Sequence, residues 1–158
     1  MVERESYGEP DLKIAGFQLW IHGREFPNSG DYYDGNWLRV TAHCGAQGAD
    51  VWTNGSLLMS TDIYGFGADC EKLLNHEGDN AVLNPIEPGL KVSLGRSDSL
   101  GHFLAVINIT PDHMTQEHRF EFEIDQTFVS NLIGQCQRIV KTFPVRGAEQ
   151  LLTKNKLP

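Results

Sequence analysis

The stretch "EHRFEFEIDQTFVSNLIGQCQRIVKTFP", residues 117–144, contains the two patterns from which we infer the fold. From Arg119 to Asp125, apolar and charged residues alternate strictly, which predicts a strand with one solvated face. After Asp125 the apolar residues recur at helical spacing, at positions 128, 129, 132, 133, 136, 139 and 140. This spacing predicts an amphipathic helix that is capped by Asp125, ends before Pro144 and packs on a sheet.

Apolar runs of strand length also precede this stretch. Alternating residues predict strands at 38–44, 90–94 and 103–109, and we expect the last of these to be central because both of its faces are apolar. A run at 11–23 changes phase near Gly16, which predicts one strand with a bulge.

Two further signals mark a turn and a second helix. Asn54-Gly55 is flanked by apolar runs and predicts the tip of a type I′ hairpin. Apolar residues then recur at helical spacing between Thr61 and Gly78. We expect a helix there that is capped by Thr61 or Asp62 and closed by Gly78.

Strand runs joined by turns, with only two helices, favour an α+β fold over alternating βαβ units. We expect a mostly antiparallel, sandwich-like sheet of about seven to eight strands, with the C-terminal helix packed on it. The length of 158 residues suits a single domain, which we place at 11–147. Residues 1–10 are expected to form a frayed N-terminus and residues 148–158 a C-terminal tail.

The charge of the chain excludes one class of partner and favours another. With 13 Lys+Arg against 21 Asp+Glu, the net charge of −8 is unsuited to nucleic acid. It suits a basic protein partner, and it equally serves solubility. No apolar run approaches the ~18 residues of a membrane span, and the acidic start "MVERESYGEP" lacks a secretory signal. We therefore expect a cytoplasmic protein whose three cysteines are buried free thiols.

The stretch "REFPNSGDYYDGNWL", residues 24–38, crowds aromatic, acidic and amide side chains between two strands. Such a composition is typical of a recognition loop. The alternative is an anchored turn, in which Asp34-Gly35 makes the bend while Phe26 and Trp37 fix the loop to the sheet. The acids lack the spacing of an EF-hand calcium loop, so no metal site is predicted.

The segment before the last strand contains the richest cluster of titratable residues, but its two histidines are not spaced as zinc ligands. We predict a solvated hairpin tip there. An enzyme would need His102, His113 or His118 in one pocket with Asp112 or Glu117. The sequence has no nucleophile elbow, phosphate loop or dinucleotide fingerprint, so we expect neither catalysis nor a cofactor.

Three parts of the chain resemble the WapI-like immunity proteins of bacteria: "GREFPNSGDYYDGNWLRV", "HFLAVINIT" followed by "TQEHRFEFEIDQTFVSNLI", and "FPVRG". The resemblance spans residues 12–147. Members of this family are intracellular antidotes to polymorphic toxins. The resemblance therefore implies a non-catalytic protein that binds a toxin and occludes its active site.

On this hypothesis the contact residues are aromatic anchors and steering acids, namely Asp31, Tyr32, Tyr33, Asp34, Glu121 and Glu123. The identity of the toxin and the oligomeric state stay open. The other class of function is a small ligand- or carbohydrate-binding module. Such a module would expose Trp20, Trp37 or Trp52 along a concave sheet face.

Overall fold

The computed structural model describes residues 7–154 as two four-stranded antiparallel sheets and three helices. The first sheet contains β1 (Leu12–Ile14), β2 (Phe17–Arg24), β3 (Trp37–Ala46) and β4 (Ala49–Met59). The second contains β5 (Asn80–Leu83), β6 (Leu90–Arg96), β7 (His102–Ile109) and β8 (Arg119–Asp125). The helices are α1 (Ser60–Leu74), α2 (Gln126–Thr142) and α3 (Ala148–Lys154). This arrangement confirms the predicted α+β class, with β7 inside its sheet as expected.

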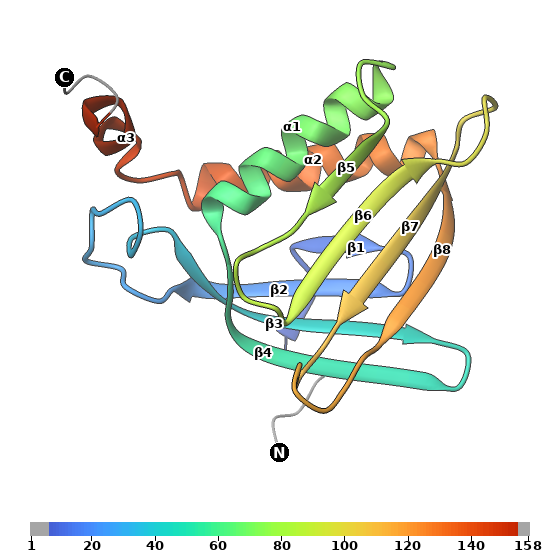
Figure 1. Cartoon of the computed structure of the whole chain (residues 1–158), viewed down its shortest axis with the longest axis horizontal. Coiled ribbons are helices and arrows are strands. Elements are labelled where there is room, and N and C mark those ends of the chain that lie inside the picture. Colours follow the sequence, from blue (N-terminus) through green and yellow to red (C-terminus); the bar gives the residue numbers. More distant parts are fainter. Residues whose placement is uncertain (1–6, 155–158) are drawn as a thin grey trace.

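Both sheets, α1 and α2 enclose a single hydrophobic core (Figure 1). Its largest fully buried side chains include Phe17 of β2, Phe66 of α1 and Phe103 of β7, so every layer contributes to it. The two helices lie against each other. Gly67 allows their close contact, because a Cβ at this position would lie 2.9 Å from the Cβ of Cys136.

Helix α2 forms as its sequence predicts. The carboxylate of Asp125 accepts a hydrogen bond from the N–H of Phe128 at 3.0 Å and so satisfies one of the free donors in the first turn. The buried residues follow the predicted apolar face, at Val129, Leu132, Cys136 and Ile139. The helix ends at Thr142, ahead of the proline at 144.

Helix α1 keeps its predicted apolar face but not its predicted ends. It begins at Ser60, and the Asp62 carboxylate accepts the N–H of Met59 at 2.8 Å. The prediction that Gly78 closes the helix is wrong, because the helix stops at Leu74. The reason is local, since His76 adopts a left-handed conformation with φ of 59° and turns the chain earlier.

The predicted hairpin at Asn54-Gly55 is wrong, because both residues lie within β4. The turn between β3 and β4 is made by Gln47 and Gly48, and Gly48 supplies the positive φ of 80° that the turn requires. Gly55 has φ of 137° next to a shift in register between the two strands. This glycine thus accompanies a bulge in a continuous strand.

The predicted single strand at 11–23 is also wrong, because Ala15 and Gly16 form a turn between β1 and β2. Ala15 has a positive φ of 51° there. Gly16 lies against β3, where its carbonyl accepts the N–H of Gly45 at 3.0 Å. A bulge and a two-residue turn produce the same change of phase in sequence, and the antiparallel pairing of β1 with β2 shows that the change is a turn.

The ends of the chain differ from a simple frayed terminus and tail. Residues 148–154 form α3, a helix that the sequence pattern did not predict. Most of the expected frayed N-terminus lies outside the described residues, but Tyr7 packs on Trp20 with ring centroids 5.5 Å apart. None of the helices within residues 7–154 is both long and apolar enough to span a membrane.

The three cysteines are buried and free, as predicted. Burial raises the pKa of Cys44 and of Cys136 to about 12, and it raises the pKa of Cys70 as well. At neutral pH the thiols therefore stay protonated, and they act as packing groups and not as nucleophiles.

Candidate partner-binding surface

The loop of residues 25–36 joins β2 to β3 and is folded by short turns. The Asp31 carboxylate accepts hydrogen bonds from the N–H groups of Tyr33 (3.0 Å) and Asp34 (3.1 Å). The Asp31 carbonyl accepts the N–H of Gly35 at 2.7 Å. A Cβ at Gly35 would lie 2.5 Å from that carbonyl oxygen, so only glycine fits the bend. Asp31 therefore shapes the loop from within.

Two aromatic side chains of this loop face solvent. Tyr33 is 51 % exposed and Phe26 is 48 % exposed. Tyr32 is half-buried and contacts Tyr33 edge-on, with ring centroids 5.4 Å apart. Asp34 is exposed beside them. The expectation that Phe26 anchors the loop is wrong, because polar contacts from another segment hold the loop instead.

Residues 144–150, which we call the clasp, supply these contacts from the C-terminal side. The amide of the fully buried Asn36 donates to the Arg146 carbonyl and accepts the Arg146 N–H, both at 2.9 Å. The same amide donates to the Tyr32 carbonyl at 2.7 Å. The Gln150 side chain accepts the N–H of Tyr32 at 3.1 Å. Side chains of the loop and of the clasp thereby form hydrogen bonds with the backbone of the other segment.

Two arginines occupy the contact between loop and clasp. The buried guanidinium of Arg24 donates to the carbonyls of Gly35 and Pro144, and Arg146 donates to two further carbonyls of the loop. Burial lowers the pKa of Arg24 below its ordinary value, and repulsion by Arg146 lowers it further. A guanidinium has five donors in a rigid plane, so each side chain can fix more than one carbonyl.

The clasp was not predicted from the sequence, although one signal pointed to it. The segments "GREFPNSGDYYDGNWLRV" and "FPVRG", which carry part of the family resemblance, contact each other through Asn36 and Arg146. Neither segment alone indicates this contact. The two segments thus form one structural unit that stabilises the loop.

Glu121 and Glu123 lie on the solvent-facing side of β8, as the alternation predicts. Arg119 forms an ion pair with Glu121. In Figure 1, β8 lies at the opposite end of the molecule from the loop of residues 25–36. The structure therefore brings together the four candidate residues of the loop and places the two glutamates elsewhere.

The histidines considered for catalysis do not share a pocket. His102 begins the eight-residue strand β7, whereas His113 and His118 follow the end of that strand. Asp112 is engaged in a turn, where its carboxylate accepts the N–H of Met114 at 3.0 Å. Within residues 7–151, no group of three or more His, Cys, Asp and Glu side chains is arranged to hold a metal ion.

His102 instead pairs with Asp98, with 2.6 Å between Nδ1 and the carboxylate. The hydrogen bond to Asp98 raises the pKa of His102 above 6.5, and nearby Glu123 and Asp125 raise it further. The same hydrogen bond lowers the pKa of Asp98 below 3.8. The pair stabilises the fold fully between about pH 4 and about pH 6.5, because its contribution is lost as pH rises through the pKa of folded His102 or falls through that of folded Asp98.

Replacing Asp98 by asparagine is expected to lower the pKa of His102. Without the Asp98 carboxylate, Glu123 and Asp125 still favour the imidazolium form, while desolvation of the ring opposes it. An NMR titration of the His102 ring measures the shift, with Asp112→Asn as the control that leaves it unchanged. A titration curve that does not move in Asp98→Asn would contradict the pairing.

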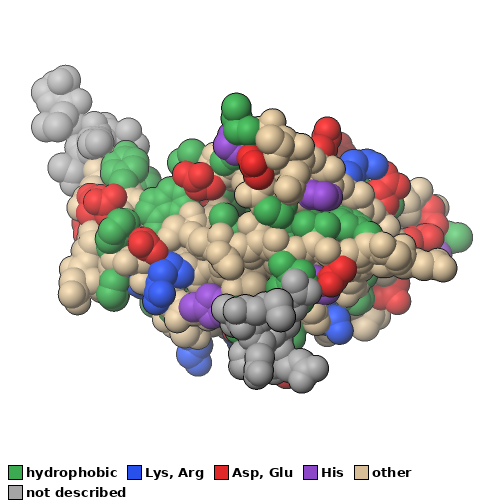
Figure 2. Space-filling model, turned by 90° about the horizontal axis from the view of Figure 1, so that it is seen from below, with side chains coloured by type: hydrophobic (Ala, Val, Ile, Leu, Met, Phe, Trp, Pro, Cys, Tyr) green, Lys and Arg blue, Asp and Glu red, His purple; other side chains and the backbone are tan. Residues whose placement is uncertain are grey.

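None of the three tryptophans considered for a carbohydrate platform is fully exposed. Trp20 is only 6 % exposed and so does not present its face to a ligand, while Trp37 and Trp52 are half-buried. Trp20 stacks on Trp52 at 5.7 Å between ring centroids, and Trp52 in turn stacks on His43 at 4.2 Å. The underside of the molecule, which includes this sheet, shows acidic, basic and apolar side chains interspersed (Figure 2).

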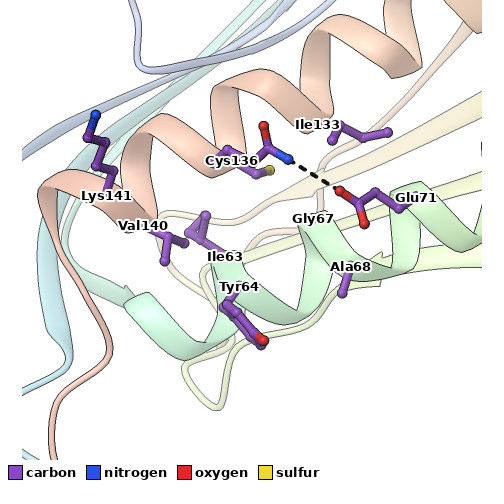
Figure 3. A pocket seen from close by; sticks show the side chains of 10 residues that line it. Ile63, Tyr64, Gly67, Ala68, Glu71, Ile133, Cys136, Val140 and Lys141 are labelled. Carbon is purple, nitrogen blue, oxygen red and sulfur yellow. Dashed lines mark hydrogen bonds between the residues drawn. The ribbon is translucent and has the colours of Figure 1, made fainter.

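A groove of about 410 Å³ runs between α1 and α2. Its floor is apolar and includes Gly67 and Cys136, while the side chains of Glu71 and Gln137 meet across it at 3.3 Å (Figure 3). Tyr64, 62 % exposed, stands at its edge. Burial raises the pKa of Cys136 to about 12, so its thiol stays protonated at neutral pH.

Comparison with known proteins identifies the family. Residues 11–144 match the model of the immunity protein WapI-like family, which therefore covers both sheets, α1 and α2. No curated protein and no solved structure matches the chain. The chain belongs to the immunity protein WapI-like family.

Proposed function

We propose that this protein is a cytoplasmic immunity protein that binds a toxin domain through the loop of residues 25–36 and occludes the toxin's active site. Membership of an immunity protein family supports the proposal. The observation that carries the choice of surface is the pair of exposed aromatic side chains, Phe26 and Tyr33, on a loop that hydrogen bonds hold in place. The protein acts by binding, without catalysis.

The loop has the composition and rigidity of an interface centre. Aromatic side chains bury large areas and dominate binding energy in many interfaces. A loop that is already ordered also loses less conformational entropy when a partner binds. The β8 face offers two acids but no exposed aromatic side chain among its described residues, so it is the weaker candidate for the centre.

The net charge of −8 supports a basic partner. A toxin that cleaves nucleic acid needs a basic surface, and opposite charges accelerate association with an acidic inhibitor. Because Glu121 and Glu123 lie far from the loop, we assign them a steering role. They contribute to the field of the protein without contacting the bound toxin.

Photo-crosslinking in the cells that make the protein tests the surface. A photoreactive phenylalanine in place of Tyr33 is expected to capture a basic protein, whereas the same residue in place of Leu104, on the β7 face, should not. The captured domain should arrest growth when produced alone, and co-production of the immunity protein should relieve the arrest. Capture from position 104 and not from position 33 would move the interface to the second sheet.

The double replacement Tyr33→Ala and Asp34→Asn is expected to weaken binding of the captured domain about thirtyfold or more, mainly by faster dissociation. Stability should change by less than about 0.5 kcal/mol, because both side chains are exposed. Surface plasmon resonance and urea unfolding measure the two effects.

The matched control is the double replacement Glu121→Gln and Glu123→Gln. It should slow association at low salt and leave dissociation unchanged. The opposite result, with unchanged binding and a large loss of stability in Tyr33→Ala and Asp34→Asn, would make the loop a purely structural element.

A further inference from the structure

We infer that the clasp holds the loop of residues 25–36 in its binding conformation, which makes Asn36, Arg146 and Gly147 positioning residues for toxin binding. They act through the loop and not by their own contact with the toxin. This inference rests on the proposed function. It adds that the affinity of the loop is set by a segment more than a hundred residues away in sequence, since Asn36 and Arg146 are 110 residues apart.

The loop cannot order itself with its own hydrogen bonds. Those within it close short turns, from Phe26 to Ser29 and from Asp31 to Gly35, and add one bond from Asp31 to Ser29 and one from the Asn36 amide to the Tyr32 carbonyl. None of these bonds fixes the loop to the sheets. Arg24 of β2 and the N–H of Ser60 hold only its end, at the carbonyls of Gly35 and Asn36. Since ordering a residue costs roughly 1–2 kcal/mol of backbone entropy, contacts from outside the loop must supply the stabilisation.

The clasp contacts the loop at its start, middle and end. The Arg146 guanidinium donates to the carbonyls of Pro27 at 2.7 Å and Ser29 at 3.0 Å. Gln150 accepts the N–H of Tyr32, next to the exposed Tyr33. At the end, the buried Asn36 is paired with the Arg146 backbone. The position of Tyr33 therefore depends on the clasp.

Gly147 allows the closest approach between the two segments. Its φ of 71° belongs to the left-handed region that favours glycine. A Cβ at this position would lie 2.4 Å from the backbone nitrogen of Tyr32 and 2.8 Å from its Cα. Alanine therefore combines backbone strain with a clash against main-chain atoms, and it must displace the clasp from the loop.

Displacing the clasp has a defined consequence for affinity. If only a fraction of molecules holds the loop in its binding conformation, the apparent affinity falls by that fraction. By reciprocity, toxin binding must in turn stabilise the closed clasp. A merely structural role would lower stability without this coupling.

Hydrogen exchange measured by mass spectrometry, without any partner, gives the first readout. Gly147→Ala is expected to raise the exchange rates of the amides at 31–35 about tenfold or more, while amides in β3 and β7 keep their rates. Gly8→Ala is the matched control, because Gly8 has the same φ of 71° but no atom within 4 Å of an added Cβ. Gly30→Ala, with the same open space inside the loop, is the second control.

A second variant tests the same contact without the risk that an added side chain disrupts folding. Arg146→Ala removes the bonds to Pro27 and Ser29 without adding atoms, and it should also raise exchange in the loop. Arg138→Ala removes the exposed arginine of α2 and should leave exchange in the loop unchanged. Unchanged loop exchange in both Gly147→Ala and Arg146→Ala would overturn the inference and leave the proposed function intact.

The second readout is the yield of the crosslink from a photoreactive phenylalanine at position 33. The inference predicts that the yield falls about tenfold in Gly147→Ala, in step with the increase in exchange. Faster exchange with an unchanged yield would overturn both the positioning role and the choice of the loop as the binding surface. The two failures are therefore distinguishable.

Discussion

Replacing Gly16 by alanine is expected to destabilise the protein by about 2–4 kcal/mol, because the site is already in contact with main-chain atoms. An added Cβ would lie 2.1 Å from the carbonyl oxygen of Gly45 and 2.9 Å from the ring of Phe122. The first contact is with the backbone of β3. This backbone is held in place because the N–H of Gly45 donates a hydrogen bond to the carbonyl of Gly16 at 3.0 Å. Only separation of the turn from both sheets relieves the clash. Urea unfolding measures the loss.

Gly65→Ala is the control, and its expected effect has the opposite sign. Gly65 lies within α1, and no atom lies within 4 Å of an added Cβ. Alanine should therefore stabilise the protein by about 0.5–1 kcal/mol through its helix propensity. Equal effects at Gly16 and Gly65 would contradict the packing described around the β1–β2 turn.

Replacing Phe66 by alanine is expected to cost about 3–5 kcal/mol. Its side chain is fully buried in the core that the two sheets share with the helices. The loss combines the transfer free energy of the ring with a cavity that rigid neighbours fill only in part. A loss of this size is a large fraction of the stability of a typical domain. Thermal and urea unfolding both measure it.

Tyr64→Ala tests the same helix on its exposed side. Tyr64 is 62 % exposed, so its loss should change stability by less than about 0.5 kcal/mol. A Phe66→Ala variant that costs as little as Tyr64→Ala would place α1 on the surface and not in the core.

The sequence predicts correctly those helices and strands whose determining residues lie within the element itself. Helix α2 combines a capping aspartate, a continuous apolar face and a following proline, and all three act within its own sequence. The strand at 119–125 is likewise set by its own alternation. Such elements need no knowledge of the rest of the fold.

The errors arose where pairing between strands decides the outcome. Asn54-Gly55 has the composition of a turn, yet β3 pairs with the chain on both sides of it and keeps the strand continuous. Gln47-Gly48 is the pair that makes the turn, because its glycine lies midway between two runs that pair with each other. Local turn chemistry cannot choose between two candidate glycines without the register.

The candidate surface was predicted in part. The loop was recognised by its aromatic and acidic composition, and the four residues from Asp31 to Asp34 do lie together. The clasp was missed, because its contacts join backbone groups to Asn36 and Arg146 across 110 residues. Backbone acceptors carry no signal in sequence, so the partners of these side chains are visible only in three dimensions.

The order of strands has a consequence for the time course of folding. Within each sheet, strands that follow one another in sequence pair with each other, so each sheet can assemble from short-range contacts, which form rapidly. Closing the clasp requires a far longer excursion of the chain, with a correspondingly larger entropic cost. The sheets thus have reason to form first, and a newly made molecule forms its strand pairs before the clasp closes on the loop of residues 25–36.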